Sequence, residues 1–217
     1  MAEDAVVAPG PVAPRGRLPA HLRWLREPDP EVVPEGDGGA AAVAVPADDH
    51  TWAYVWPAGT RMAPELPALA PLAGARLCDL GCGLGALGFT ALGAGAAEVF
   101  FADGAAGAVA WIDAVIAANG LAARARAARH QWGTPLPGSP WPLIVGGDIL
   151  YRPASFPALV ATIRASLAPD GICLLSDPRQ RLEDELPELM RAHGLCHSQE
   201  RRPPGYSLLR ITLQRTA

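Results

Sequence analysis

Short apolar runs alternate with segments of helical periodicity along the chain from residue 76 onward. The runs have the length of buried strands, and the segments between them carry apolar residues at helical spacing. A repeated strand–helix order is typical of a parallel sheet covered by helices on both faces. The pattern predicts strands at 76–80, 98–102, 143–146 and 172–176, a weak strand at 125–128, and helices at 86–94, 107–119, 155–167 and 182–192.

The C-terminal end breaks this alternation. Residues 195–200 and 206–213 both have strand patterns, and only a turn through 203–205 separates them. Such a pair should be antiparallel, because parallel neighbours need a longer crossover. We therefore expect an α/β Rossmann-like sheet of seven strands, mostly parallel, with an antiparallel C-terminal strand.

The N-terminal part of the chain differs in composition from the rest. Residues 1–45 are rich in Pro, Ala and Gly, which is typical of a mobile tail. Within it we expect no more than a short helical turn at 21–26 and a strand at 40–46. The sequence thus predicts a tail over 1–45 and one domain over 46–217.

Composition and charge narrow the function classes. The 217 residues are 50% hydrophobic, which fits one globular domain with a substantial core. The net charge is −4 and there is no basic run, so an extended nucleic-acid surface is not expected. No apolar stretch is long enough to span a bilayer, and the first residues do not resemble a signal peptide. The four cysteines lack zinc-site spacing, and we expect reduced thiols in a cytoplasmic, monomeric protein.

The most informative segment is 77–85, Leu-Cys-Asp-Leu-Gly-Cys-Gly-Leu-Gly. An apolar strand ends at Asp79, and three glycines then alternate around Cys82, at Gly81, Gly83 and Gly85. Glycine supplies positive φ angles for a tight turn and lets a ligand approach bare backbone. A carboxylate just before the turn disfavours a pyrophosphate and favours a ligand with a cation. S-adenosylmethionine (SAM), which carries an ammonium and a sulfonium, fits this pattern.

The same glycines leave a second interpretation open. Residues 83–88 also satisfy the G-x-G-x-x-G dinucleotide fingerprint, a weak signal by itself. Asp79 would then lie close to the pyrophosphate, and the turn comes a third of the way along the chain. The antiparallel last strand also argues for a methyltransferase sheet. An NAD(P) oxidoreductase nevertheless remains the alternative, as does a glycine turn with no ligand.

Other candidate residues follow the next strands, because ligands in open α/β sheets bind beyond the carboxyl ends of the strands. Asp103 ends the strand at 98–102 and suits the ribose hydroxyls; the alternative is a cap for the next helix. Gln131 could hydrogen-bond the adenine edge. Trp132 either walls the same pocket or lies in the core.

A second polar group follows the strand at 143–146. Gly147 precedes Asp148 and would allow close approach of a ligand, and Tyr151 lies three residues further on. Asp148 and Tyr151 can then point into one mouth; the alternative is a helix-capping acid and a core tyrosine. Upstream, Trp52, Tyr54 and Trp56 alternate, so a strand there would place three rings on one side. These rings would form either an aromatic lip over the reacting centre or part of the core.

Four segments together resemble a known family: 52–59 (Trp-Ala-Tyr-Val-Trp-Pro-Ala-Gly), 79–85, 148–151 (Asp-Ile-Leu-Tyr) and 177–179 (Asp-Pro-Arg). The chain resembles the seven-strand, class I, SAM-dependent protein-lysine methyltransferases over roughly 50–217. It is most similar to the branch that modifies the electron transfer flavoprotein beta subunit and to its bacterial relatives.

The resemblance implies roles for individual residues. It implies SAM contacts for Asp79, Gly81 and Asp103, and an acceptor site at Asp148 and Tyr151, with Trp56 nearby. It also implies a protein substrate with an exposed lysine, such as the flavoprotein subunit or a ribosomal protein. Arg152 stands where the family commonly has an acid after the Asp-x-x-Tyr motif, and Gln131 stands at an adenine-side position that is often acidic. A small-molecule N-methyltransferase and an inactive SAM-binding protein are the remaining alternatives.

Overall fold

The computed structural model describes residues 50–178, 186–203 and 205–215. The tail predicted over 1–45, the turn at 21–26, the strand at 40–46, residues 182–185 of the last predicted helix, Arg179 and Pro204 lie outside the described residues. No helix in the described ranges is both long enough and apolar enough to cross a membrane.

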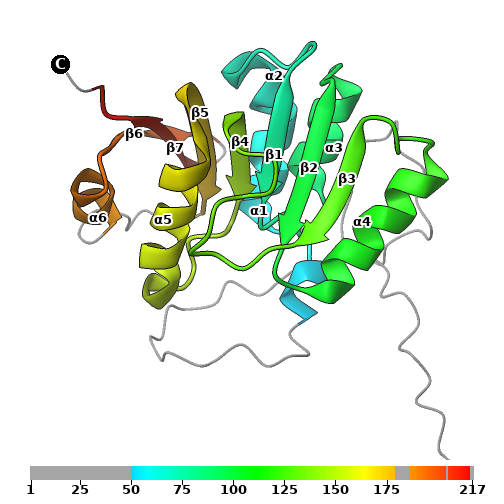
Figure 1. Ribbon diagram of the computed structural model, residues 1–217, viewed down its shortest axis with the longest axis horizontal. Helices are drawn as coiled ribbons and strands as arrows, with labels where there is room; N and C mark the ends of the chain where they lie inside the picture. The colour runs from blue at the N-terminus through cyan, green and yellow to red at the C-terminus, as the bar shows by residue number, and fades with distance from the viewer. Residues whose placement is uncertain (1–49, 179–185, 204, 216–217) are drawn as a thin grey trace, which may run out of the picture.

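Seven strands form one sheet in the order β3-β2-β1-β4-β5-β7-β6 (Figure 1). Strands β1 to β5 run parallel, and β7 is antiparallel to both of its neighbours, β5 and β6. This confirms the predicted mixed sheet. The strands are β1 (Arg76–Leu80), β2 (Glu98–Asp103), β3 (Ala125–Arg129), β4 (Trp141–Gly147), β5 (Leu167–Asp177), β6 (Leu195–Arg202) and β7 (Tyr206–Leu213).

Helices cover both faces of the sheet, as the alternation predicted. One core cluster joins helices at the N-terminal side and after β1 and β2 to one face, and another joins α5 and α6 to the opposite face. The helices are η1 (His50–Ala53), α1 (Pro57–Met62), η2 (Ala63–Glu65), α2 (Leu66–Leu69), α3 (Ala86–Gly93), α4 (Ala106–Ala118), η3 (Pro153–Ser155), α5 (Phe156–Ser166) and α6 (Leu186–Ala192).

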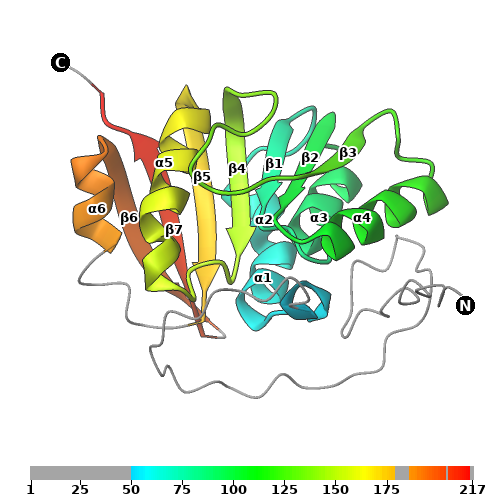
Figure 2. The same cartoon turned by 60° about the horizontal axis from the view of Figure 1, so that its bottom comes forward.

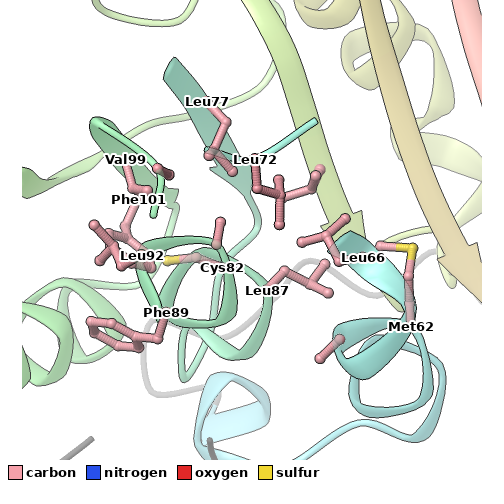
Figure 3. Packing of buried hydrophobic residues seen from close by; sticks show 14 of the residues in the cluster. Met62, Leu66, Leu72, Leu77, Cys82, Leu87, Phe89, Leu92, Val99 and Phe101 are labelled. Atoms are coloured by element: carbon pink, nitrogen blue, oxygen red, sulfur yellow. The ribbon is translucent and has the colours of Figure 1, made fainter. Parts of the chain in front are cut away.

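The two faces of each central strand point into different cores. Leu77 belongs to one cluster and Cys78 to the other, and Val99 and Phe100 alternate in the same way. Figure 3 shows Leu77 and Val99 in the cluster that also holds Met62 of α1 and Leu87 of α3. The short N-terminal helices are thereby attached to the sheet.

Three sequence predictions are wrong in detail. Residues 52–56 form no strand: Trp52 lies in η1, and Trp56 is the N-cap of α1. Strand β4 begins at Trp141, ahead of the predicted 143. The predicted helix stop at 169–171 lies inside β5, opposite an irregularity in the register between β4 and β5. A Cβ on Gly171 would lie 2.9 Å from the carbonyl oxygen of Trp141, so glycine permits this close crossing.

Candidate active site

A pocket opens at the carboxyl ends of β1, β2 and β4, where helix α1 lies beneath the arrowhead of β4 (Figure 2). This is the edge at which ligands bind in open α/β sheets. Residues from five segments of the chain line it: Thr51, Trp52, Tyr54, Val55, Trp56, Gly59 and Thr60; Asp79, Gly81–Leu84, Ala86 and Leu87; Asp103 and Ala105; Trp132; and Gly147–Ile149 and Tyr151.

The glycine turn between β1 and α3 forms one side of the pocket. Gly81, Gly83 and Gly85 have φ angles of 64°, 49° and 79°, values that side-chain-bearing residues rarely adopt. The N–H groups of Gly81 and Cys82 donate to the carbonyl oxygen of Ala102, at 2.8 and 3.2 Å, which ties the turn to β2. Gly81, Cys82 and Gly83 line the pocket, whereas Gly85 is the N-cap of α3 and lies outside the lining.

Asp79 lies beneath this turn and is 2% exposed. Its Oδ2 accepts a hydrogen bond of 2.8 Å from the N–H of Gly88 in α3. Burial raises the pKa of Asp79 to about 8; the Gly88 N–H lowers it and the Asp103 carboxylate raises it further. A cation near Asp79 would favour the charged form. Without a ligand Asp79 is therefore mostly neutral at pH 7, and its pairing with a cationic ligand stays a prediction.

Asp103 ends β2 and also lines the pocket. Its carboxylate accepts hydrogen bonds of 2.9 Å from the N–H groups of Gly83 and Ala105. Ala105 is the N-cap of α4, and its side chain makes no capping bond, so Asp103 is not itself the helix cap. The acid instead joins the glycine turn to the start of α4, and burial raises its pKa. Each carboxylate oxygen has further acceptor capacity for a hydroxyl group.

The two residues after β3 differ in position. Trp132 is part of the lining and also packs against the second core cluster while only partly buried, so each of the two interpretations holds in part. Gln131 is exposed and lies outside the lining, with its side chain against Gly104. The proposed contact of Gln131 with adenine therefore remains a prediction.

Asp148 lies at the end of β4 and is 6% exposed. Its Oδ1 accepts a 3.3 Å hydrogen bond from Ala58 N–H, and its Oδ2 accepts a 2.6 Å bond from Gly59 N–H. Burial raises the pKa of Asp148 to about 6; the two α1 N–H groups and Arg61 lower it, and Asp177 raises it. Asp148 is thus a helix-capping acid, but for α1 and not for the helix that follows it in sequence.

An aromatic group lies beside Asp148 at the same end of the pocket. The rings of Trp56 and Tyr151 stack, with centroids 6.4 Å apart and planes at 8°, and Tyr54 meets Trp56 edge-on at 6.3 Å. Tyr151 is 45% exposed and so is not the core residue that one interpretation required. Trp52, Tyr54 and Trp56 all line the pocket although no strand forms there, and their predicted role as a lip over the reacting centre stays a prediction.

Sequence reasoning missed several lining residues. Gly59 and Thr60 belong to α1, a helix that the short Trp-Pro-Ala-Gly segment did not predict, although proline at the first helical position was an available signal. Ile149 lines the pocket from between Asp148 and Tyr151. Asp177 is 1% exposed and lies outside the lining, beside it at the end of β5.

Comparisons with known proteins agree with this architecture. A family model for a methyltransferase domain matches residues 57–209. No curated protein matches the chain. Similar solved structures include a TehB-like SAM-dependent methyltransferase from Corynebacterium glutamicum, with 19% identity, TM-score 0.58, and coverage of 72% of this chain and 88% of that one.

Two further structures have the same fold at low identity. The ribosomal protein L11 methylase from Lactobacillus delbrueckii subsp. bulgaricus shares 19% identity at a TM-score of 0.57, over 72% of this chain and 79% of that one. The glycopeptide N-methyltransferase MtfA, complexed with sinefungin, shares 15% identity at a TM-score of 0.61, over 73% and 95%. At such identities these likenesses concern the fold.

The family match covers most of the described chain and includes α1, the glycine turn, Asp103 and the segment from Asp148 to Tyr151. It favours the predicted methyltransferase over the dinucleotide oxidoreductase. The chain belongs to the methyltransferase domain family, and S-adenosylmethionine is the methyl donor that this membership supports.

Proposed function

We propose that this protein transfers a methyl group from SAM to an amine nitrogen, and that the amine is a lysine side chain of a protein. The observation that carries the proposal is the chemistry of the two ends of one pocket. The lining combines the glycine turn, Asp79 and Asp103, which we call the donor end, with Asp148 and the stacked Trp56 and Tyr151, which we call the acceptor end.

The donor end suits SAM through its backbone and its acids. The bare turn at Gly81 and Gly83 admits close approach, and Asp103 has acceptor capacity for ribose hydroxyls. Asp79 would lose its proton and become negatively charged beside a cation. When bound there, SAM supplies an electrophilic methyl group on a sulfonium. The alignment of the acceptor with that group is what the chain must provide.

The acceptor end suits a nitrogen that is cationic in solution. Free lysine has a pKa of about 10.4, so it must lose a proton before it attacks. Asp148 would hold and orient the amine, because its pKa of about 6 leaves it mostly ionised at neutral pH. The faces of Trp56 and Tyr151 would favour the cationic forms on entry and exit. Removal from water would lower the pKa of the amine, and its proton would leave through solvent.

The test is label transfer from methyl-labelled SAM into a lysine-rich bacterial extract. We expect labelled protein bands that yield N-methyllysine after hydrolysis. Asp148→Asn should reduce transfer at least 100-fold while calorimetry still detects SAM binding. The matched control is Asp113→Asn on the exposed face of α4, which should retain full transfer. Wild-type transfer by the Asp148 variant would refute the role of Asp148.

A second candidate is a small-molecule N-methyltransferase. The fold is shared with a glycopeptide N-methyltransferase as well as with a ribosomal protein methylase. The same assay separates the two, because label in the low-molecular-weight fraction and none in protein would favour the small-molecule acceptor. SAM binding without any transfer would favour a SAM-binding protein that lacks catalysis. A melting temperature raised by NADH and not by SAM would favour an NAD(P) oxidoreductase.

A further inference from the structure

Helix α1 begins without any cap from its own sequence. Its N-cap residue is Trp56, whose side chain makes no capping bond, and Pro57 at the next position has no N–H. The first N–H groups of the helix are therefore those of Ala58 and Gly59, and orphan N–H groups at a buried helix start need acceptors. Both donate to the carboxylate of Asp148, at 3.3 and 2.6 Å.

The absence of a side chain at Gly147 makes this contact possible, whereas Gly59 has room for a methyl group. A Cβ on Gly147 would lie 2.6 Å from the Cα of Gly59, a distance at which backbone atoms would have to move. A Cβ on Gly59 would lie 3.4 Å from the Cα of Gly147 and 3.5 Å from Oδ2 of Asp148. The start of α1 thus lies directly against the backbone at the end of β4.

The conformation of Asp148 is unusual in the same place. Its φ angle is +57°, which makes it the one residue other than glycine with positive φ in the described ranges. Strain of this kind persists where the surroundings over-determine the conformation and is concentrated at functional sites. The strained backbone turns the carboxylate toward α1, while the N–H of Asp148 donates to the carbonyl oxygen of Ser176 at 2.8 Å.

The contact determines the position of the aromatic pair. Trp56 immediately precedes the capped turn of α1, and Tyr151 follows Asp148 by three residues. The two rings stack at 8°, and the indole N–H of Trp56 donates to the carbonyl oxygen of Thr51 at 2.9 Å. The carboxylate of Asp148 therefore joins the segment that carries Trp56 to the segment that carries Tyr151.

We propose that Asp148 is also a positioning residue: from the end of β4 it caps α1, which lies 89 residues earlier in the same chain, and thereby holds Trp56 against Tyr151 on the acceptor side of the pocket. The catalytic meaning of this arrangement rests on the proposed function, but the contact itself requires neither SAM nor an acceptor. The segments 56–59 (Trp-Pro-Ala-Gly) and 147–151 (Gly-Asp-Ile-Leu-Tyr) then form one structural unit, joined by the hydrogen bonds of Asp148.

The capping of α1 should depend on pH, because protonation changes how many hydrogen bonds Asp148 can accept. A protonated carboxyl keeps one accepting oxygen and turns the other into a donor, so α1 loses one of its two caps. Burial and the neighbouring Asp177 of β5 raise the pKa of Asp148 to about 6, against Arg61 and the N–H groups of α1, which lower it. The position of Trp56 should therefore change as the pH falls from 7 to 5.

The experiment measures the tryptophan indole N–H resonances of the full chain, labelled with ¹⁵N-tryptophan, without SAM. Trp56→Phe assigns the Trp56 signal by its disappearance. In the wild type we expect that signal to shift with a midpoint near pH 6. In Asp148→Asn, which can accept only one of the two hydrogen bonds, it should be displaced at neutral pH and should not titrate. Asp113→Asn should match the wild type.

A second variant keeps the test decisive if Asp148→Asn does not fold. Gly147→Ala leaves every polar group in place, but its Cβ would lie 2.6 Å from the Cα of Gly59, so it must push α1 away from the end of β4 and should displace the Trp56 signal. An unmoved Trp56 signal in both variants, or a wild-type titration that persists in Asp148→Asn, would overturn the proposal. Because the measurement needs no methyl donor, failure of methyl transfer leaves its outcome unaffected.

Discussion

At two of the helices that begin at the pocket, α3 and α1, a buried aspartate at the end of a strand accepts a hydrogen bond from an N–H of the first turn. At α3, Gly85 is the N-cap and Asp79 accepts from Gly88 N–H, nine residues away. At α1, Trp56 is the N-cap and Asp148 accepts from Gly59 N–H, 89 residues away. The physics is the same, since orphan helical N–H groups find a carboxylate at a strand end. Only the pairing of Asp79 with Gly88 joins residues close enough in sequence for a local pattern to predict that they lie together.

The two carboxylates also differ in how much their charge is compensated. Asp79 accepts one backbone N–H and has Asp103 as a charged neighbour, and its pKa rises to about 8. Asp148 accepts two N–H groups and has Arg61 nearby, and its pKa rises only to about 6. At pH 7, Asp79 is therefore mostly neutral, whereas Asp148 is mostly charged.

The largest effect should be the pH dependence of stability at Asp79. Its folded pKa of about 8 lies above the ordinary value of 3.8, so its contribution to stability is complete below pH 3.8 and is lost as the pH rises through 8. Asp79→Asn keeps an acceptor for Gly88 N–H and cannot ionise. Between pH 5 and 8 the free energy of unfolding of this variant, measured in urea, should rise relative to wild type by up to about 1.4 kcal/mol per pH unit.

The same measurement on Asp148 tests the contrast. For Asp148→Asn the corresponding rise should end near pH 6, where the folded carboxyl of the wild type has lost its proton. If both variants showed the same pH window, the difference in compensation between the two caps would be wrong.

A smaller effect is expected from a methyl group in the glycine turn. Gly83→Ala must adopt a φ of +49° and would bring its Cβ to 3.1 Å from the carbonyl oxygen of Trp52, inside the pocket lining. We expect at least a tenfold loss of SAM affinity by calorimetry, about 1.4 kcal/mol. Gly120→Ala is the matched control, with a φ of +65° and no atom near its Cβ.

The control separates strain from obstruction. Both substitutions force alanine into the left-handed region, at a cost of about 1–2 kcal/mol in stability, so both should lower the melting temperature. Only Gly83→Ala should also weaken SAM binding. Equal affinities in the two variants would mean that the turn does not contact the ligand.

The donor half could be predicted from the sequence because its parts are contiguous. An apolar strand, an acid and alternating glycines specify the turn at 79–85, and the structure has these residues where the pattern required them. The sheet followed from the same reasoning, because alternation and the short C-terminal turn are local features. The least accurate boundary was that of β5, where an irregular register carries Pro169–Gly171 into the strand.

The part of the pocket around Trp56, Asp148 and Tyr151 could not be predicted to the same extent, because contacts between distant parts of the chain determine its structure. Trp52, Tyr54 and Trp56 alternate as a strand would, but the residues around them fold as η1 and α1. Helix α1 is only six residues long, too short to be stable alone, and it depends on Asp148 and on the close approach that Gly147 allows. No local pattern reports an acceptor 89 residues away.

A more modest effect is expected in the pH dependence of SAM binding. A cation beside Asp79 favours its ionised form, so binding should release a proton where free Asp79 is neutral. SAM affinity should therefore rise several-fold between pH 6 and 7.5, and calorimetry in buffers of different ionisation enthalpy should detect the proton. Asp79→Asn should bind with a flat profile over this range. If the SAM affinity of the wild type were equally independent of pH, Asp79 would not interact with the charge of the ligand.

The smallest effect should come from the residue that joins the two halves. The indole of Trp52 lies against Gly107 of α4, where a Cβ would be 2.5 Å from its Cζ2, and its carbonyl oxygen borders Gly83. Trp52→Phe should cost about 1 kcal/mol or less in the free energy of unfolding, because Trp52 is only partly buried. Gly107→Ala should cost more, through overpacking. The double variant should recover part of that loss, because phenylalanine frees the space that the new methyl group occupies. Strictly additive losses in urea unfolding would show that the packing of Trp52 of η1 against α4 does not contribute to the stability of the protein.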